Sequence, residues 1–266
     1  MKPSTAPFSG AVIARIGGAC GLCGAAHWLD YDAAPALAAL SRWWTALSSP
    51  TTEADRAFLA LLARGGGRKM LATLVGRDAC GATVTLRAFS GDLGGASDVA
   101  GCVPSVIRRE DTAALENETL QIVAQATARL TSCDPAVRDL ARRERRQASA
   151  ALMAAMIDAT RLRTRGGRRV PLRDAFVGAR AGRGIPSGTA DCALPKLLDA
   201  AWALRLEVVS AAEASWAPGV VDGERAHGAL AAPCDLRCAP LLGAMLCPTG
   251  PTGPIGLTGP TGGAPA

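Results

Sequence analysis

The sequence predicts an α/β fold of the mixed, α+β kind, in which a small sheet is flanked by helices. Residues 69–76 and 82–89 have the composition of β-strands, and the turn-forming segment Arg77–Gly81 lies between them, which is the pattern of a β-hairpin. Apolar residues at helical spacing precede this hairpin, and further helical segments follow it. The chain has 266 residues, of which 49% are apolar, so it is long enough to bury one sizeable core or two small ones.

Residues 33–109 are predicted to form one half of the core, made of helices and the hairpin. Within residues 33–64, four apolar residues repeat at helical spacing, so this segment predicts one or two helices: they are Leu37, Leu40, Trp44 and Leu47. The glycines of Gly65–Gly67 end the helical region. Residues 1–32 precede this half of the core and are predicted to be irregular.

Residues 110–170 predict a basic helical insertion. Asp134 and Pro135 are a helix-start signal, because an Asp at the N-cap is followed by proline at the first helical position. The segment Arg138–Arg169 contains ten arginines against three acidic residues. Such a basic helix can contact RNA phosphates without reading the base sequence, or it can be an ordinary solvated surface. The candidate RNA-binding residues are Arg142, Arg143, Arg145 and Arg146.

Residues 178–247 are predicted to form the other half of the core. Residues 191–203 predict a helix, residues 205–212 a buried strand, and residues 233–246 a second helix. Beyond this half, glycine recurs at every third position, which is a collagen-like pattern, but five triplets are too few for a stable triple helix. Residues 248–266 are therefore predicted to be a disordered tail.

The composition favours an anionic partner and a reducing compartment. The formal net charge is +6 and the pI is about 9.0, although an arginine-rich solvated surface would give the same charge. The sequence has no signal-peptide pattern near its start, and no apolar run approaches the ~18 residues of a membrane span. We therefore expect a cytoplasmic protein without membrane association. Its nine cysteines should be reduced, which favours metal binding or simple burial over disulfides.

Three cysteines of the C-terminal half predict a zinc site. Cys234 and Cys238 are four positions apart, so on a helix they would share one face with Cβ atoms about 5–6 Å apart. Cys192 opens the preceding predicted helix, and the partial positive charge of a helix N-terminus favours the thiolate that binds a metal. We expect these three thiolates to hold Zn²⁺. The alternative is that they are buried as small apolar side chains.

A second group of metal-binding residue types lies near the N-terminal end. Cys20 and Cys23 are separated by two residues, and His27 follows after three more. This spacing could be one half of a second metal site, but the sequence shows no obvious partner pair for it.

The order of the three C-terminal cysteines is similar to the metal framework of nucleobase deaminases, in which one His or Cys and a later Pro-Cys pair hold zinc. In that family a catalytic glutamate lies two residues after the first ligand, where this sequence has Leu194. Glu213 is the best substitute for proton transfer, and the alternative is that it is a surface or hydrogen-bonded carboxylate. Glu213 or His227 could instead be the fourth ligand of a closed, structural site.

Longer motifs resemble the N-terminal accessory region that precedes the catalytic domain in some bacterial RNA pseudouridine synthases of the large-ribosomal-subunit type. The resemblance runs in order through most of the chain. The specific blocks are Pro186-Ser-Gly-Thr-Ala-Asp-Cys-Ala-Leu-Pro-Lys-Leu-Leu198 and the stretch from His227-Gly228 through Pro233-Cys-x₃-Cys238 to Met245. Weaker matches are the hairpin with Phe89-Ser-Gly-Asp-Leu-Gly-Gly95, then Val103-Pro104 and Ala212-Glu-Ala-Ser-Trp216. The middle helical section is shorter and richer in arginine than that family implies.

The resemblance implies a diverged, deaminase-like fold and an association with RNA modification. The His-Arg-Leu-Asp motif that supplies the catalytic aspartate of pseudouridine synthases is absent from this sequence, so the isomerase chemistry itself is not implied. The resemblance implies a zinc-binding accessory domain that is not catalytic on its own, with RNA or a pseudouridine synthase catalytic domain as its partner. The alternatives are an active zinc-dependent nucleobase or nucleotide deaminase and a non-enzymatic interaction protein.

Overall fold

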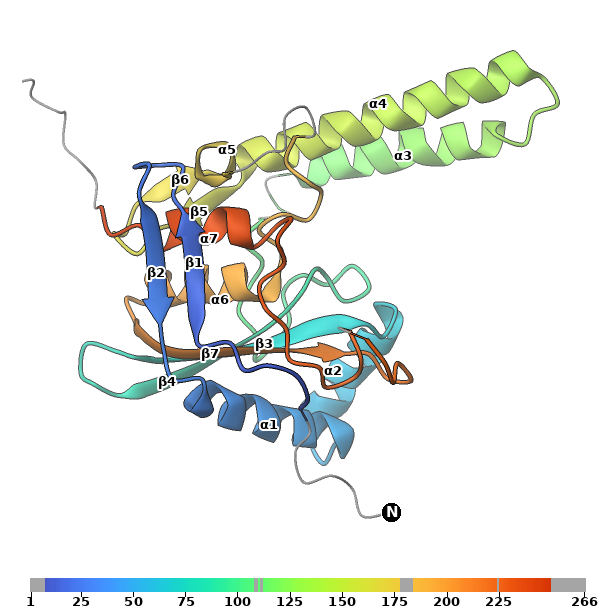
Figure 1. Ribbon diagram of the computed structural model, residues 1–266. Helices are drawn as coiled ribbons and strands as arrows, with labels where there is room; N and C mark the ends of the chain where they lie inside the picture. The colour runs from blue at the N-terminus through green and yellow to red at the C-terminus, as the bar shows by residue number, and fades with distance from the viewer. Residues whose placement is uncertain (1–7, 108–109, 111, 178–183, 224, 250–266) are drawn as a thin grey trace, which may run out of the picture.

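The computed structural model describes residues 8–107, 110, 112–177, 184–223 and 225–249 (Figure 1). Within these residues the chain combines helices with small antiparallel sheets. The mixed α+β class predicted from the sequence is therefore confirmed. No helix of the described part is both long and apolar enough to cross a lipid bilayer.

A three-stranded antiparallel sheet forms the centre of the molecule. Its strands are β3 (Lys69–Arg77), β4 (Thr83–Phe89) and β7 (Glu207–Trp216), in the order β4-β3-β7. The predicted hairpin is the β3–β4 pair, in which Leu71 lies opposite Phe89. The strand predicted for residues 205–212 is β7, which pairs with the other edge of β3.

Helices cover both faces of this sheet (Figure 1). On one face lie α1 (Ala34–Ser48) and α2 (Glu53–Arg64), and on the other lie α6 (Ala193–Ala203) and α7 (Ala239–Met245). Because successive side chains of a strand point to opposite faces, β3 contributes alternately to the two layers. One predicted boundary differs: the helix expected over residues 233–246 begins at Ala239.

The buried face between α1 and the sheet combines apolar packing with hydrogen bonds. Leu71 packs against the aromatic and leucine side chains of α1 and α2. The Thr73 hydroxyl donates to the carbonyl of Ala36 at 2.8 Å, and the Ala36 amide donates to the Ser210 hydroxyl at 3.0 Å. These bonds satisfy polar groups that are buried between strand and helix. On the other face, Leu74 belongs to a larger core cluster that includes residues of α6 and α7.

A long helical hairpin projects from this body (Figure 1). It consists of α3 (Ala113–Arg129) and α4 (Pro135–Ala159). The Asp134 side chain accepts a hydrogen bond from the Ala136 amide at 2.8 Å, which is the N-cap that the sequence predicted for α4. An ion pair between Arg129 and Glu144 joins the two helices.

After α4, the chain forms short secondary-structure elements that were not predicted from the sequence. Two short paired strands, β5 (Arg161–Arg163) and β6 (Arg169–Pro171), follow α4, and the one-turn helix α5 (Leu172–Ala175) comes next. Strands of three residues are too short for an alternating apolar pattern to be recognised.

The prediction of irregular structure for residues 1–32 is corrected by a second hairpin. Strand β1 (Arg15–Ala19) pairs antiparallel with β2 (Ala26–Asp30). Gly17 and Gly18 lie inside β1, and glycine normally weakens a strand, which is why the sequence did not indicate one. Of the predicted tail, residues 250–266 lie outside the described part of the chain.

Candidate metal centre and its carboxylate pocket

The structure brings the sulfur atoms of Cys192, Cys234 and Cys238 together. All three lie within 4.8 Å of one another, and the Sγ atoms of Cys234 and Cys238 are 3.5 Å apart. A tetrahedral zinc ion with bonds of about 2.3 Å requires sulfur–sulfur distances of about 3.8 Å. This group could therefore hold a metal ion.

Two helix N-termini present these sulfurs. Cys192 is the N-cap residue of α6, in an extended conformation with φ −72° and ψ 156°. Cys238 is the N-cap residue of α7, and Cys234 lies in the turn before it. The amides of Cys238 and Ala239 both donate to the carbonyl of Cys234 at 3.1 Å. The cysteine pair is thus held by a turn at the helix entry and does not share a helix face, although its sulfurs still converge.

A buried ion pair fixes the loop that precedes Cys192. Lys196 is only 1% exposed, and its Nζ lies 2.7 Å from Asp191 Oδ1. The same ammonium group donates to the carbonyls of Phe89 at 3.1 Å and Gly91 at 2.6 Å. Burial lowers the pKa of Lys196, and the Asp191 carboxylate partly opposes this. The pair ties the start of α6 to the loop that follows β4.

Sequence analysis did not identify the role of Lys196. The signal for it was a single lysine within the otherwise apolar first turns of α6, where a charged side chain is rarely buried without a partner.

The three thiols shift one another's pKa values. Hydrogen bonding to the Cys192 and Cys238 side chains holds the pKa of Cys234 well below its usual range. The hydrogen bond to Cys234 is also the largest cause that raises the pKa of Cys192 to about 12, and hydrogen bonding to its two neighbours raises the pKa of Cys238. A bound divalent cation would compensate the charge of all three thiolates.

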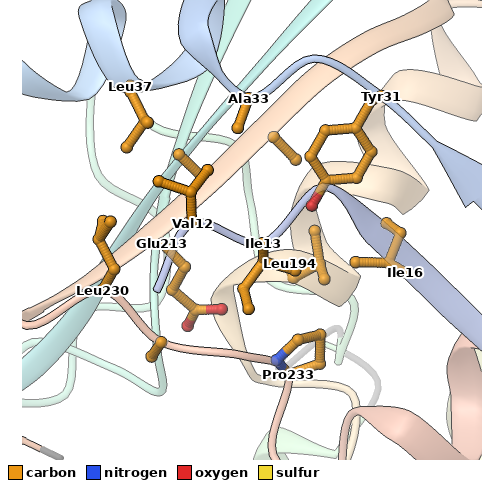
Figure 2. A pocket seen from close by; sticks show the side chains of 13 residues that line it. Val12, Ile13, Ile16, Tyr31, Ala33, Leu37, Leu194, Glu213, Leu230 and Pro233 are labelled. Carbon is orange, nitrogen blue, oxygen red and sulfur yellow. The ribbon is translucent and has the colours of Figure 1, made fainter. Parts of the chain in front are cut away.

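Glu213 lies beside this sulfur group. It pairs across the sheet with Ala72 of β3, so it shares the face that packs against α6 and α7. Figure 2 shows its carboxylate directed into a pocket that is also lined by Leu194 and Pro233. Burial raises the pKa of Glu213 to about 8, and the negative charge of Cys234 adds to this effect.

The pocket around Glu213 is small and mainly apolar. Its volume is about 20 Å³, and its walls include Ile13, Tyr31 and Leu230 (Figure 2). Such a volume admits about one water molecule, whereas pockets for small-molecule ligands are about 300 Å³ or larger. In this conformation the pocket has room for a water molecule beside the carboxylate.

The structure does not bring His227 to the three sulfurs. Its Nδ1 accepts a hydrogen bond from the Ala217 amide at 3.1 Å. Its ring lies 4.8 Å from the ring of Trp44 and 4.9 Å from that of Trp216, measured between centroids. Burial lowers the pKa of His227. This histidine belongs to the aromatic packing on the α1 side of the sheet.

The four candidate RNA-binding arginines lie on the projecting hairpin. Arg142, Arg143, Arg145 and Arg146 are all exposed on α4. Arg142 also forms an ion pair with Asp139 at 2.7 Å. A second set of arginines borders a groove of about 620 Å³ on the body of the molecule: they are Arg163, Arg165 and Arg205.

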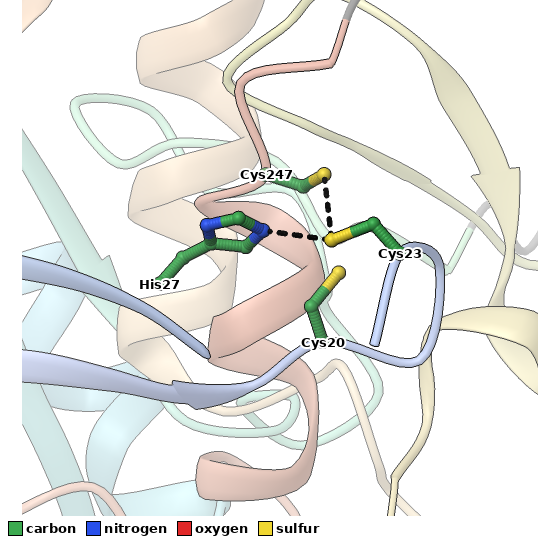
Figure 3. A group of neighbouring side chains, drawn as sticks. All are labelled: Cys20, Cys23, His27 and Cys247. Carbon is green, nitrogen blue, oxygen red and sulfur yellow. Dashed lines mark hydrogen bonds between the residues drawn. The ribbon is translucent and has the colours of Figure 1, made fainter. Parts of the chain in front are cut away.

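A second group of metal-binding side chains lies near the far end of α7 (Figure 3). It contains Cys20, Cys23, His27 and Cys247, whose ligand atoms all lie within 4.8 Å of one another. The first three residues were noted in the sequence. Cys247 was missed because it lies more than 200 positions later in the chain, and the only sequence signal was a further cysteine directly after the helix of the first site.

Searches of protein-family models, curated proteins and solved structures find no significant match to this chain. The interpretation of the two groups therefore depends on their own geometry and chemistry.

Proposed function

We propose that this chain is a zinc-binding accessory domain of deaminase-like fold that is associated with RNA modification and is not catalytic on its own. The observation that carries the proposal is the meeting of Cys192, Cys234 and Cys238 at distances that fit one tetrahedral ion.

The donor set favours zinc. Three thiolates without carboxylate or carbonyl ligands are typical of zinc and of iron–sulfur clusters, and they disfavour magnesium, calcium or manganese. Cys192 and Cys238 are the N-cap residues of α6 and α7, and Cys234 lies in the turn before α7, so two segments far apart in the sequence supply the three sulfurs. When bound, zinc supplies a Lewis acid and the positive charge that keeps all three sulfurs ionised.

The fold supports the resemblance to deaminases. The described order is a helix layer, the β3–β4 hairpin, α6 with Cys192 at its start, β7, and α7 with Cys238 at its start. This is the order that a deaminase-like fold implies. The hairpin of α3 and α4 is an insertion between β4 and α6.

Two features support a domain without catalytic activity of its own. Leu194 occupies the position that holds the catalytic glutamate in deaminases, and an aliphatic side chain cannot transfer protons. The pocket beside the sulfurs is too small for a base, at about 20 Å³.

An active deaminase is the second candidate function, and Glu213 is the observation that favours it. The carboxylate is directed into the pocket beside Pro233, next to the ligand Cys234, and its raised pKa of about 8 would let it hold a proton at neutral pH. Incubation with cytidine, adenosine and RNA separates the two functions. We expect no ammonia release. Release that is lost in Glu213→Gln would establish the second function and contradict the first.

The link to RNA is supported by charge and by shape. The exposed arginines of α4 lie on an arm that projects from the body (Figure 1), where they are accessible to a phosphate backbone. Arg163, Arg165 and Arg205 border a groove of about 620 Å³ on the body, and basic grooves of this kind can contact a nucleic-acid backbone. A pseudouridine synthase catalytic domain would supply the chemistry that this chain lacks.

Zinc analysis of the purified protein tests the proposal. We expect Cys234→Ser to lose about one equivalent of zinc relative to the wild type, because a three-thiolate site does not survive loss of a ligand. Cys133→Ser is the matched control, since Cys133 is exposed and belongs to neither group, and it should retain the wild-type zinc content. Equal zinc content in both variants would contradict the proposal.

A further inference from the structure

The second cysteine and histidine group has the dimensions of a complete tetrahedral site. Cys23 Sγ lies 3.1 Å from His27 Nε2 and 4.0 Å from Cys247 Sγ. With Zn–S bonds of about 2.3 Å and Zn–N bonds of about 2.0 Å, ligand atoms are expected about 3.5–3.8 Å apart. Figure 3 shows the four side chains converging from the hairpin and from the segment after α7.

The turn between Cys20 and Cys23 is folded so that both sulfurs face the same side. The Cys20 amide donates to the carbonyl of Ala25 at 2.8 Å, and the Gly24 amide donates to the carbonyl of Cys20 at 3.0 Å. The Leu22 amide donates to Cys20 Sγ at 3.4 Å. Burial raises the pKa of Cys20 to about 11, and this amide partly opposes the effect. Gly24 has φ +77°, a conformation that favours glycine.

The paired strands place His27 beside this turn. His27 lies opposite Gly18 in the β1–β2 register. A side chain at the neighbouring Gly17 would place its Cβ 2.1 Å from the His27 carbonyl oxygen. Gly17 is thus explained by the close approach of its backbone to the strand that carries the histidine.

Backbone packing between α7 and β1 places Cys247 next to the other three side chains of the group. A Cβ at Gly243 of α7 would lie 2.1 Å from the carbonyl oxygen of Ala19, so helix and strand are in direct contact. Cys247 is buried two residues after α7 ends, and its carbonyl accepts a hydrogen bond from the Gly166 amide at 2.9 Å. The fourth ligand is therefore held by contacts that do not involve the other three.

We propose that Cys20, Cys23, His27 and Cys247 bind one Zn²⁺ ion in a closed, structural site. Four protein ligands leave no position for a substrate, so the ion fastens the β1–β2 hairpin to the end of α7. Cys238 caps the start of the same helix. The two metal sites thus lie at opposite ends of α7, and the second site holds in place the helix that presents a ligand of the first.

The experiment compares zinc content in the full-length protein and three variants. We expect about two zinc ions in the wild type and in Cys133→Ser, and about one in Cys23→Ser and in Cys234→Ser. Cys23 and Cys234 are both exposed, so each substitution removes a ligand with little loss of packing. X-ray absorption at the zinc edge of the wild type should show an imidazole ligand together with sulfur, since only the second site contains a histidine.

The outcomes separate the two sites. One zinc ion in the wild type that is lost in Cys234→Ser but kept in Cys23→Ser would overturn the second site and leave the proposed function standing. One zinc ion with the reverse pattern would support the second site alone. An absorption spectrum without imidazole, or a zinc-free protein with a disulfide between Cys23 and Cys247, would overturn the second site without recourse to any variant.

Discussion

Asp191 connects the sulfur group to a buried polar network. Its carboxylate neutralises Lys196, accepts a hydrogen bond from the Ser105 hydroxyl at 2.9 Å, and directly precedes Cys192. Because the Lys196 ammonium group is almost completely buried, it needs this countercharge. The position of the first ligand therefore depends on a buried polar network.

Asp191→Asn is expected to destabilise the protein by about 3 kcal/mol, because it leaves a buried charge without its partner. Denaturant unfolding measures the loss. Asp139→Asn is the matched control, since the Asp139–Arg142 pair is exposed and should contribute less than about 1 kcal/mol. Equal losses of stability in the two variants would contradict a large stabilising contribution from the Asp191–Lys196 ion pair.

His227 gives a prediction about pH. Its folded-state pKa is lowered by burial, so the folded protein favours the neutral ring while the unfolded chain protonates near its ordinary pKa of about 6.5. The associated stability is present above that pH and is lost as the pH falls below it. We expect His227→Asn, whose amide oxygen can still accept from the Ala217 amide, to weaken this acid-induced loss in unfolding experiments. An unchanged pH profile would contradict the assignment.

At the scale of elements, the sequence predicted those that have a strong local pattern. The β3–β4 hairpin was predicted from two strand-like runs and a turn, and α6 from its apolar spacing. The β1–β2 hairpin was not predicted because Gly17 and Gly18 weaken any strand signal, and its pairing is maintained by packing against α7. Tertiary contacts, which local propensity does not encode, determine such elements.

In the candidate sites too, residues marked by a local sequence pattern could be predicted, and residues brought in by tertiary contacts could not. Cys192, Cys234 and Cys238 could be grouped because each lies at a predicted helix start, and the structure brings them together. The partner of Cys20 and Cys23 could not be found, because Cys247 reaches them only through the contact between Gly243 and β1. His227 was considered as a ligand from its position near Cys234, but the chain turns it toward Trp44 and Trp216.

The α3–α4 hairpin gives a prediction for RNA binding. Replacing Arg142, Arg143, Arg145 and Arg146 together with Gln should weaken binding to single-stranded RNA at least about tenfold at low salt, and the dependence of affinity on salt should decrease, because fewer phosphates are contacted. Filter binding at two salt concentrations measures both effects. The control changes four exposed arginines on the body: Arg15, Arg64, Arg68 and Arg77. Equal loss in both variants would contradict a specific role of the hairpin.

The whole molecule consists of a layered body and a basic arm (Figure 1). In the body, α7 packs between α6 and the β1–β2 hairpin, and metal-binding side chains lie at both of its ends. A helix of seven residues has little stability of its own. Metal ions at both ends would supply that stability through protein ligands that are far apart in the sequence.

Anomalous scattering from crystals of the protein, measured at the zinc absorption edge, tests the central claim most directly. The account predicts a zinc peak about 2.3 Å from each of the sulfur atoms of Cys192, Cys234 and Cys238. The absence of a peak at these three sulfurs, or a disulfide between Cys234 and Cys238, would contradict it.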